Sequence, residues 1–190
     1  MKLSPARISG RPEHKRASHR ALRPSSPAPE LQLQLKTILV PVDFSSSACK
    51  ALRYAFALAR DYGARLIVLH VVETSYAGSE VASPDLPLVE KRRCEMADKK
   101  LREFLREAGC DALEPQVIVT AGNPLREIVE IAQGLQVDLL LISTHAKSAL
   151  PDLCLASAAE QIVRYAPCPV LVVREDEHDC LCSQRKPSRD

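Results

Sequence analysis

The stretch ISTHAKSALPDLCLASAAEQIVRYAPCPVLVVR occupies residues 142–174, and ILVPVDFS stands earlier at residues 38–45. The longer stretch begins with the end of an apolar run, which predicts a strand, and continues as a loop to residue 157. Ser157-x-x-Glu160 is a capping box, the side-chain pattern of a helix start. Pro169–Val173 is a second apolar run. The stretch therefore predicts a strand, a loop, a capped helix and a closing strand.

The same alternation continues toward the N-terminus. Continuous apolar runs predict buried strands at Thr37–Val42, Arg65–Val72, Gln116–Thr120 and Val137–Ile142. Helical periodicity joins them from Ser45 or Ser46 to about Tyr62, from Leu88 to about Ala108, and from Pro124 to Gly134, with a loop at Thr74–Pro87. Five strands joined by helices predict an α/β fold, a doubly wound parallel sheet with helices on both faces.

Side-chain chemistry marks the helix ends. Gly63 is a predicted stop for the first helix, and Asn123 followed by proline predicts the start of the third. The apolar positions of the second helix form one stripe, which predicts its buried face. That stripe consists of Leu88, Cys94, Ala97, Leu101, Phe104 and Leu105.

The two ends of the chain differ from its middle in composition. Residues 1–34 form a basic extension rich in Pro, Arg and Ser, and its few apolar residues predict disorder. Residues 35–174 are expected to form one domain. Residues 175–190 are polar and are expected to be a frayed C-terminal tail.

Charge and composition exclude several classes of function. The net charge is +2, yet residues 1–30 carry +5 and the remainder −3, so the folded part is mildly acidic and does not predict nucleic-acid binding. No apolar run is long enough to predict a membrane span, and the N-terminus lacks the apolar core of a secretory signal. Seven irregularly spaced cysteines favour reduced thiols and a cytoplasmic location. A transit peptide is the less favoured reading of the basic N-terminus.

Two segments carry a resemblance to a known family. Pro41-Val42-Asp43-Phe44-Ser45 and the loop from Ser143 to Ser157, closed by APCPVLVVR, resemble the universal stress protein family over residues 36–174. The resemblance implies strand order 3-2-1-4-5, a cytoplasmic stress-response protein and an adenine-nucleotide site, with ATP or AMP and Mg²⁺ as the possible ligands. Open α/β sheets bind ligands where the winding reverses, here between the first and fourth strands.

The resemblance also implies which residues border that site. The Pro-x-Asp turn brings Asp43 near the adenine, Val71 packs on the ring, and the loop faces the phosphates. The candidate binding residues are Pro41, Val42, Asp43, Val71, Ser143, His145, Ala146, Lys147, Ala156, Ser157 and Ala158. Asp43 can equally accept hydrogen bonds from the following backbone, Val71 can be a plain strand residue, and Ser157 can be a helix cap alone.

The loop departs from the family pattern at its glycines. Nucleotide-binding members carry G-x-x-G-x₉-G-[ST], whereas this chain has Ser143, Ala146 and Ala156 at the glycine positions and keeps Ser157. Each substitution adds a Cβ where the backbone would approach phosphate oxygens. The departure therefore predicts weak or absent ATP binding.

No catalytic set can be assembled from the sequence. There is no Walker or Rossmann glycine motif, and the turn after the first strand lacks the glycines of an ATP pyrophosphatase loop. His145 has no second titratable group placed to act with it, and Cys180-x-Cys182 is one isolated pair, which is weak evidence for a metal. We therefore expect no enzyme activity and no resident metal.

Three functions stay open at this stage. The first is a non-enzymatic stress-response protein with a degenerate nucleotide site, the second an ATP- or AMP-binding switch, and the third a partner-binding module that uses its basic extension. The apolar strand Pro169–Val173 lies at the sheet edge in the implied order. An exposed edge pairs readily with another strand, and family members dimerise through it, so we expect a homodimer.

Overall fold

The computed structural model describes residues 32–74, 86–144 and 158–181, and its helices and strands all belong to a unit spanning Gln34–Asp190. The strands are β1 (Thr37–Pro41), β2 (Arg65–Glu73), β3 (Gln116–Gly122), β4 (Leu139–Thr144) and β5 (Val170–Arg174). The helices are α1 (Ser46–Tyr62), α2 (Leu86–Glu107), α3 (Pro124–Gly134) and α4 (Ala158–Tyr165). The strands form one parallel sheet in the order β3-β2-β1-β4-β5, which confirms the expected fold.

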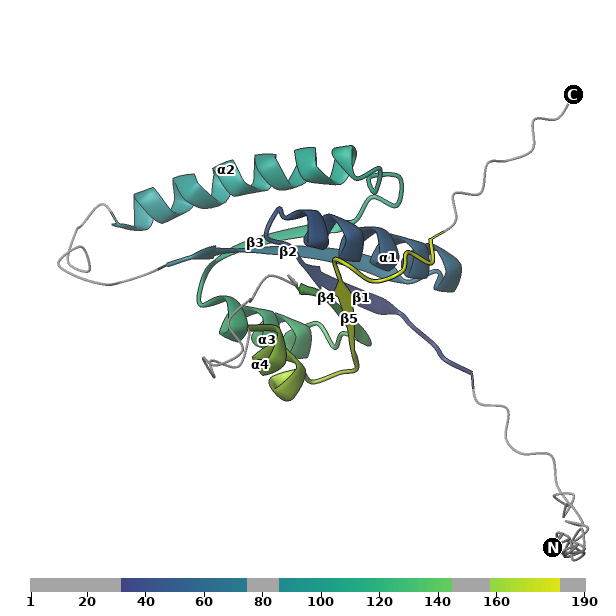
Figure 1. Cartoon of the computed structure of the whole chain (residues 1–190). Helices are drawn as coiled ribbons and strands as arrows, with labels where there is room; N and C mark the ends of the chain where they lie inside the picture. Colours follow the sequence, from purple (N-terminus) through teal and green to yellow (C-terminus); the bar gives the residue numbers. More distant parts are fainter. Residues whose placement is uncertain (1–31, 75–85, 145–157, 182–190) are drawn as a thin grey trace, which may run out of the picture. The chain divides into compact units, whose positions relative to one another are not determined.

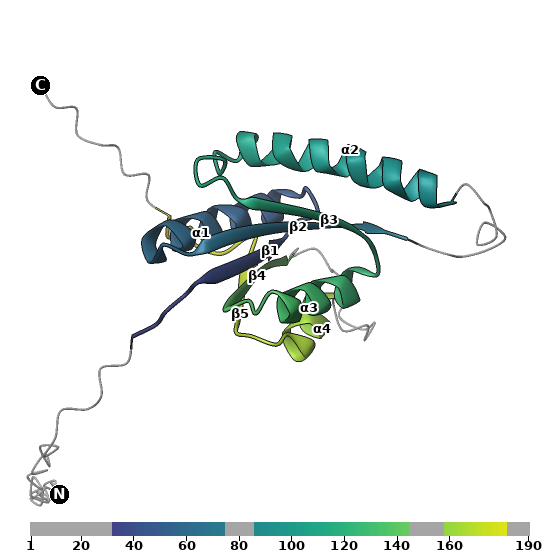
Figure 2. The same cartoon turned by 180° about the vertical axis from the view of Figure 1, so that it is seen from behind.

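Helices cover both faces of this sheet. Helices α1 and α2 lie on one face and α3 and α4 on the other (Figures 1 and 2). Neighbouring residues of β1 point to opposite faces: Ile38 and Val40 join the core beneath α1 and α2, and Leu39 joins the core beneath α3 and α4. All three are fully buried. The continuous apolar strands of the sequence are thus explained, because each strand packs on both sides.

The predicted cap residues mark both ends of α1 and the start of α3. Ser45 is the N-cap of α1, and its Oγ accepts a hydrogen bond of 3.1 Å from the Ala48 amide. Gly63 ends α1 with a φ of 66°, a left-handed conformation that favours glycine. Asn123 caps α3 by accepting a hydrogen bond of 3.1 Å from the Arg126 amide. These caps fix the directions in which α1 and α3 leave the sheet.

Helix α2 corrects one expectation about the buried stripe. It begins at Leu86, and Leu88 is 51% exposed rather than buried. Only Leu101 and Leu105 of the helix are buried. The N-terminal half of α2 extends past the end of β3, as Figure 1 shows, and the apolar residues Leu88 and Val89 near its start are left about half exposed. The apolar periodicity correctly predicted a helix here. It did not indicate which part of the helix packs on the sheet.

The start of the C-terminal tail also differs from expectation. Residues 175–181, here called the C-terminal strap, are held against α1 rather than frayed. Lys50 Nζ donates hydrogen bonds to the carbonyls of Arg174, Glu175 and Glu177 at 3.1, 3.3 and 2.8 Å. The Cys180 amide donates to the Tyr54 hydroxyl at 2.8 Å. Backbone groups of the strap make most of these bonds, so its polar composition gave no sign of them.

Among the described residues, no helix is long and apolar enough to cross a membrane.

Candidate functional site

A pocket opens at the point where the winding of the sheet reverses. It lies at the carboxyl ends of β1, β2 and β4, on the face covered by α3 and α4, and has a volume of about 330 Å³. Parallel strands leave backbone groups and loop residues at this edge, which is where open α/β sheets bind ligands. The volume is at the small end of the range for small-molecule sites.

The structure brings six of the predicted binding residues to this pocket. They come from the turn after β1, from β2, from the end of β4 and from the start of α4, and they are Pro41, Val42, Asp43, Val71, Ser143 and Ala158. The other five predicted residues lie outside the described residues. These are His145, Ala146, Lys147, Ala156 and Ser157.

The turn that carries Asp43 is fixed by short hydrogen bonds. The Ser45 amide donates to Asp43 Oδ1 at 3.0 Å, and the Ser45 hydroxyl donates to the same oxygen. The Val42 amide donates to the Leu69 carbonyl at 2.8 Å, which ties the turn to β2. Asp43 thus orients the residue that caps α1. A carboxylate has two oxygens and several acceptor positions, so this bond is compatible with a contact to a ligand.

The next residue, Phe44, shows that the turn is a sharp one. Its φ is 64°, in the left-handed region that non-glycine residues seldom occupy. The Phe44 ring packs against His70 with ring centroids 4.3 Å apart, and the His70 Nδ1 lies 2.8 Å from the Val42 carbonyl oxygen. A carbonyl only accepts, so His70 donates this bond from Nδ1. Phe44 and His70 therefore support the Asp43 turn from behind.

Sequence reasoning missed much of the pocket wall. The wall is mainly apolar, and its further members are Leu69, His70, Glu73, Pro124, Ile128, Ile142 and Ile162. Glu73 and Val71 lie on the same side of β2, because alternate residues of a strand share a face. The two-residue spacing from Val71 could therefore have predicted that Glu73 lines the pocket. Ile128 and Ile162 come from helices whose placement over the pocket becomes visible only in the folded chain.

The charges around the pocket limit what it can hold. Asp43 and Glu73 are the two carboxylates in the described lining, and none of the described lining residues is a lysine or arginine. An apolar slot with acceptor groups suits a flat heteroaromatic ring whose amino group donates a hydrogen bond. A triphosphate would meet two negative side chains and no cation in this part of the wall.

The described residues contain no evidence of a reactive cysteine or of a metal site. Burial raises the pKa of the Cys110 thiol to about 11, and nearby Cys49 adds to that shift. The thiol is therefore protonated near neutral pH and a poor nucleophile. Cys180 is exposed, whereas its sequence partner Cys182 lies outside the described residues. No cluster of three or more metal-ligating side chains occurs in the part of the chain that is described.

Comparison with known proteins gives universal stress proteins both by sequence and by structure. The model of the universal stress protein family matches residues 34–174. A universal stress protein of Thermus aquaticus is 36% identical over 141 residues, which is 73% of this chain and 98% of that protein. UspA of Lactobacillus plantarum superimposes with a TM-score of 0.61 at 25% identity, covering 75% of this chain and all of that one. The solved structure of MJ0577 superimposes with a TM-score of 0.60 at 29% identity, covering 77% of this chain and 100% of that one.

Proposed function

The chain belongs to the universal stress protein family, and we propose that it is a non-enzymatic, cytoplasmic stress-response protein whose pocket takes the adenosine part of a nucleotide and holds its phosphates weakly. The observation that carries this proposal is the charge of the pocket wall. The wall is apolar, contains Asp43 and Glu73, and offers no cation among its described residues. Adenine has an apolar ring and an amino donor, and both match such a wall.

The loop sequence supports weak phosphate binding. Ser143, Ala146 and Ala156 occupy positions that are glycine in nucleotide-binding members of the family. Ser143 lies at the end of β4 and lines the pocket. We infer that its Cβ takes up space that a glycine would leave for a phosphate oxygen. Lys147 is the one lysine or arginine within the loop sequence 143–157. We therefore infer that the base and ribose supply most of the binding energy.

Calorimetric titration with adenosine, AMP and ATP, with and without Mg²⁺, tests this proposal. We expect the three dissociation constants to agree within about tenfold, equivalent to about 1.4 kcal/mol. ATP that binds more than a hundred times more tightly than adenosine would show that the loop still holds phosphates. The double variant Ala146→Gly with Ala156→Gly should strengthen ATP binding and leave adenosine binding unchanged.

A matched pair of variants shows whether the pocket is the site. Ala158 is exposed at the start of α4 and lines the pocket, so Ala158→Phe should fill it without disturbing the core. Val163 is 50% exposed on the same helix and does not line the pocket, so Val163→Phe is the control. We expect adenosine binding to be lost in the first variant and kept in the second. Phosphate release from ATP should be equally slow in both, as expected for a protein without hydrolase activity.

The proposal includes a homodimer formed through β5. This strand is at the edge of the sheet, and Leu171 is 38% exposed. The Leu140 amide donates to the Pro169 carbonyl, and Leu140 is in register with Val170. A parallel ladder uses alternate residues, so the Leu171 amide faces β4 and the Val172 amide faces the open edge. Two such edges meeting about a twofold axis would extend the sheet.

Proline substitutions distinguish the edge of β5 that faces β4 from the edge that is open to a second copy of the chain. Val172→Pro removes an outward donor, so we expect a folded protein that is monomeric at tens of micromolar by light scattering. Leu171→Pro removes an internal ladder bond and should unfold at lower urea concentration. A wild-type protein that is monomeric at these concentrations, or a Val172→Pro variant that remains dimeric, would exclude this interface.

A further inference from the structure

A second hollow lies on the opposite face of the sheet from the nucleotide pocket. It has a volume of about 380 Å³ and lies between the end of β2 and the middle of α2. We call it the α2 groove. Its apolar lining is Phe44, Val72, Met96 and Ala97, and its polar lining is His70, Arg93 and Lys100. Val71 lines the nucleotide pocket and Val72 lines the α2 groove, because successive strand residues point to opposite faces, and His70 is in the lining of both.

The floor of the α2 groove is rigid and apolar. Phe44 is fixed between two aromatic side chains, with centroid distances of 4.3 Å to His70 and 5.7 Å to Phe104. Val72 is 7% exposed, so it is held by the core. Met96 on the opposite wall is 71% exposed, and its flexible thioether side chain can close over a bound aliphatic group. The floor thus offers apolar contact area in a preformed shape.

Two cations stand over this floor from one side of α2. Arg93, Met96, Ala97 and Lys100 follow helical spacing, so they share one face of the helix. Lys100 Nζ lies 4.1 Å from the centre of the Phe44 ring, and Arg93 Nη2 donates to the Glu73 carbonyl oxygen at 3.3 Å. No aspartate or glutamate is among the described lining of the α2 groove.

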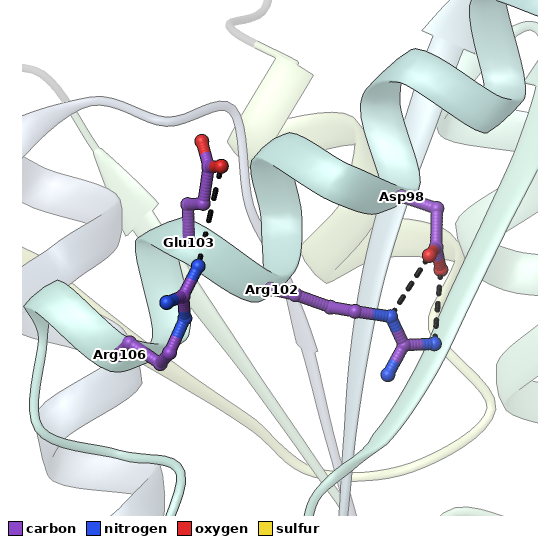
Figure 3. Close-up of polar contacts among 4 residues, drawn as sticks. All are labelled: Asp98, Arg102, Glu103 and Arg106. Carbon is purple, nitrogen blue, oxygen red and sulfur yellow. Dashed lines mark hydrogen bonds and ion pairs between the residues drawn. The ribbon is translucent and has the colours of Figure 1, made fainter.

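Two other cations of α2 pair with carboxylates of the same helix, as Figure 3 shows. Arg102 binds Asp98 at 2.8 Å, and Arg106 approaches Glu103 at 4.0 Å. Arg93 and Lys100 have no such ion pair with a carboxylate in the described ranges. The two cations of the α2 groove therefore form no close ion pair with a described carboxylate, and no described carboxylate lines the groove.

We propose that the α2 groove binds a small amphipathic carboxylate, of the class of medium-chain fatty acids. The aliphatic chain would lie on Phe44 and Val72 beneath Met96, and the carboxylate would be held between Arg93 and Lys100. Arg93 offers a planar set of donors suited to a carboxylate, and both ammonium and guanidinium bonds to an anion are stronger than neutral hydrogen bonds. The volume of about 380 Å³ lies within the range of small-molecule sites and is large enough for a ligand of this size.

The test is calorimetric titration with decanoate below its micelle concentration, beside decanol as the uncharged ligand with the same chain. We expect saturable binding of decanoate and at least about tenfold weaker binding of decanol, since the lost contact with two cations is worth about 1.4 kcal/mol or more. The double variant Arg93→Gln with Lys100→Gln should reduce decanoate affinity by about tenfold. Lys91→Gln with Lys99→Gln makes the same charge change on the same helix outside the groove and should change it less than twofold.

Three outcomes would overturn the proposal. The first is the absence of saturable decanoate binding by the wild-type protein. The second is an equal loss of affinity in both double variants, because that result would reflect net charge rather than the groove. The third is sedimentation with phosphatidylglycerol vesicles in the absence of decanoate binding, which would indicate a membrane surface instead.

Discussion

Helices α1 and α2 cover the same face of the sheet but contribute to the protein in different ways (Figure 2). Helix α1 contacts β1, β4 and β5, and its buried residues are Ser47, Ala48, Ala51, Leu52, Ala55 and Ala59. Helix α2 is five residues longer, contacts β2 and β3, and buries only Leu101 and Leu105. The longer helix is thus the less buried one.

The difference follows from side-chain size and position over the sheet. The alanines of α1 allow its backbone to lie close to the middle strands, where both sides of the contact are dry. Helix α2 lies over the β3 edge and leaves Leu88, Val89 and Met96 exposed at 51%, 49% and 71%. An unburied apolar surface beside unpaired cations contributes little to stability and remains available for binding. We infer that α1 mainly stabilises the fold and that α2 mainly presents a surface.

A leucine-to-alanine substitution in each helix should give the largest expected difference in the free energy of unfolding. Leu52→Ala in α1 removes a fully buried side chain and should lower the free energy of unfolding by about 3 kcal/mol, within the range of about 2–5 kcal/mol for buried leucines. Leu88→Ala in α2 removes a side chain that is 51% exposed and should cost less than about 0.5 kcal/mol. Urea unfolding followed by circular dichroism measures both. Equal losses would mean that α2 is as integral to the core as α1.

The sequence predicted the elements of the fold better than their extent. All five strands and four helices were recognised because buried parallel strands are continuous apolar runs and the helix caps are Ser45, Gly63 and Asn123. Leu88 was placed wrongly because the helical period is the same whether or not a sheet lies beneath the helix. The C-terminal strap was missed because its backbone, and not its side-chain hydrophobicity, bonds to Lys50 and Tyr54.

The candidate site was predictable where its residues follow a strand end. The turn at Asp43 and the end of β4 at Ser143 meet because β1 and β4 are neighbours in the sheet. Residues that reach the pocket from helix faces, such as Ile128 and Ile162, could not be assigned from local sequence. The α2 groove was missed for a related reason. Arg93 and Lys100 look like ordinary surface charges in the sequence, and only the folded chain places Lys100 over Phe44 and both cations at one hollow.

The next expected effect concerns the attachment of the C-terminal strap to α1. Lys50→Met keeps an aliphatic chain but removes three hydrogen bonds to backbone carbonyls, and we expect a loss of about 1 kcal/mol. Hydrogen exchange at the Cys180 amide, which is bonded to Tyr54, should accelerate in the variant. Lys99→Met on the exposed side of α2 is the control and should change neither quantity. An unchanged Cys180 exchange rate in Lys50→Met would show that the bonds from Tyr54 and Ser46 are enough to hold the strap.

The smallest expected effect is the loss of one of the α2 surface ion pairs drawn in Figure 3. Asp98 stands four residues before Arg102 and accepts hydrogen bonds from its Nε and Nη2 at 2.8 and 3.2 Å, which raises the pKa of the Arg102 guanidinium. Both side chains are substantially exposed, at 38% and 61%, so Asp98→Asn should cost only about 0.3–0.5 kcal/mol. Glu103→Gln breaks a longer contact of 4.0 Å and should cost less.

High salt distinguishes this interpretation from a structural role for Asp98. The difference between wild type and Asp98→Asn should shrink in 1 M NaCl, where the screening length falls to about 3 Å. A loss above about 1 kcal/mol that persists in high salt would contradict a weak surface pair. It would also contradict the division of roles between the helices, because α2 would then stabilise the fold through its polar face as α1 does through its alanines.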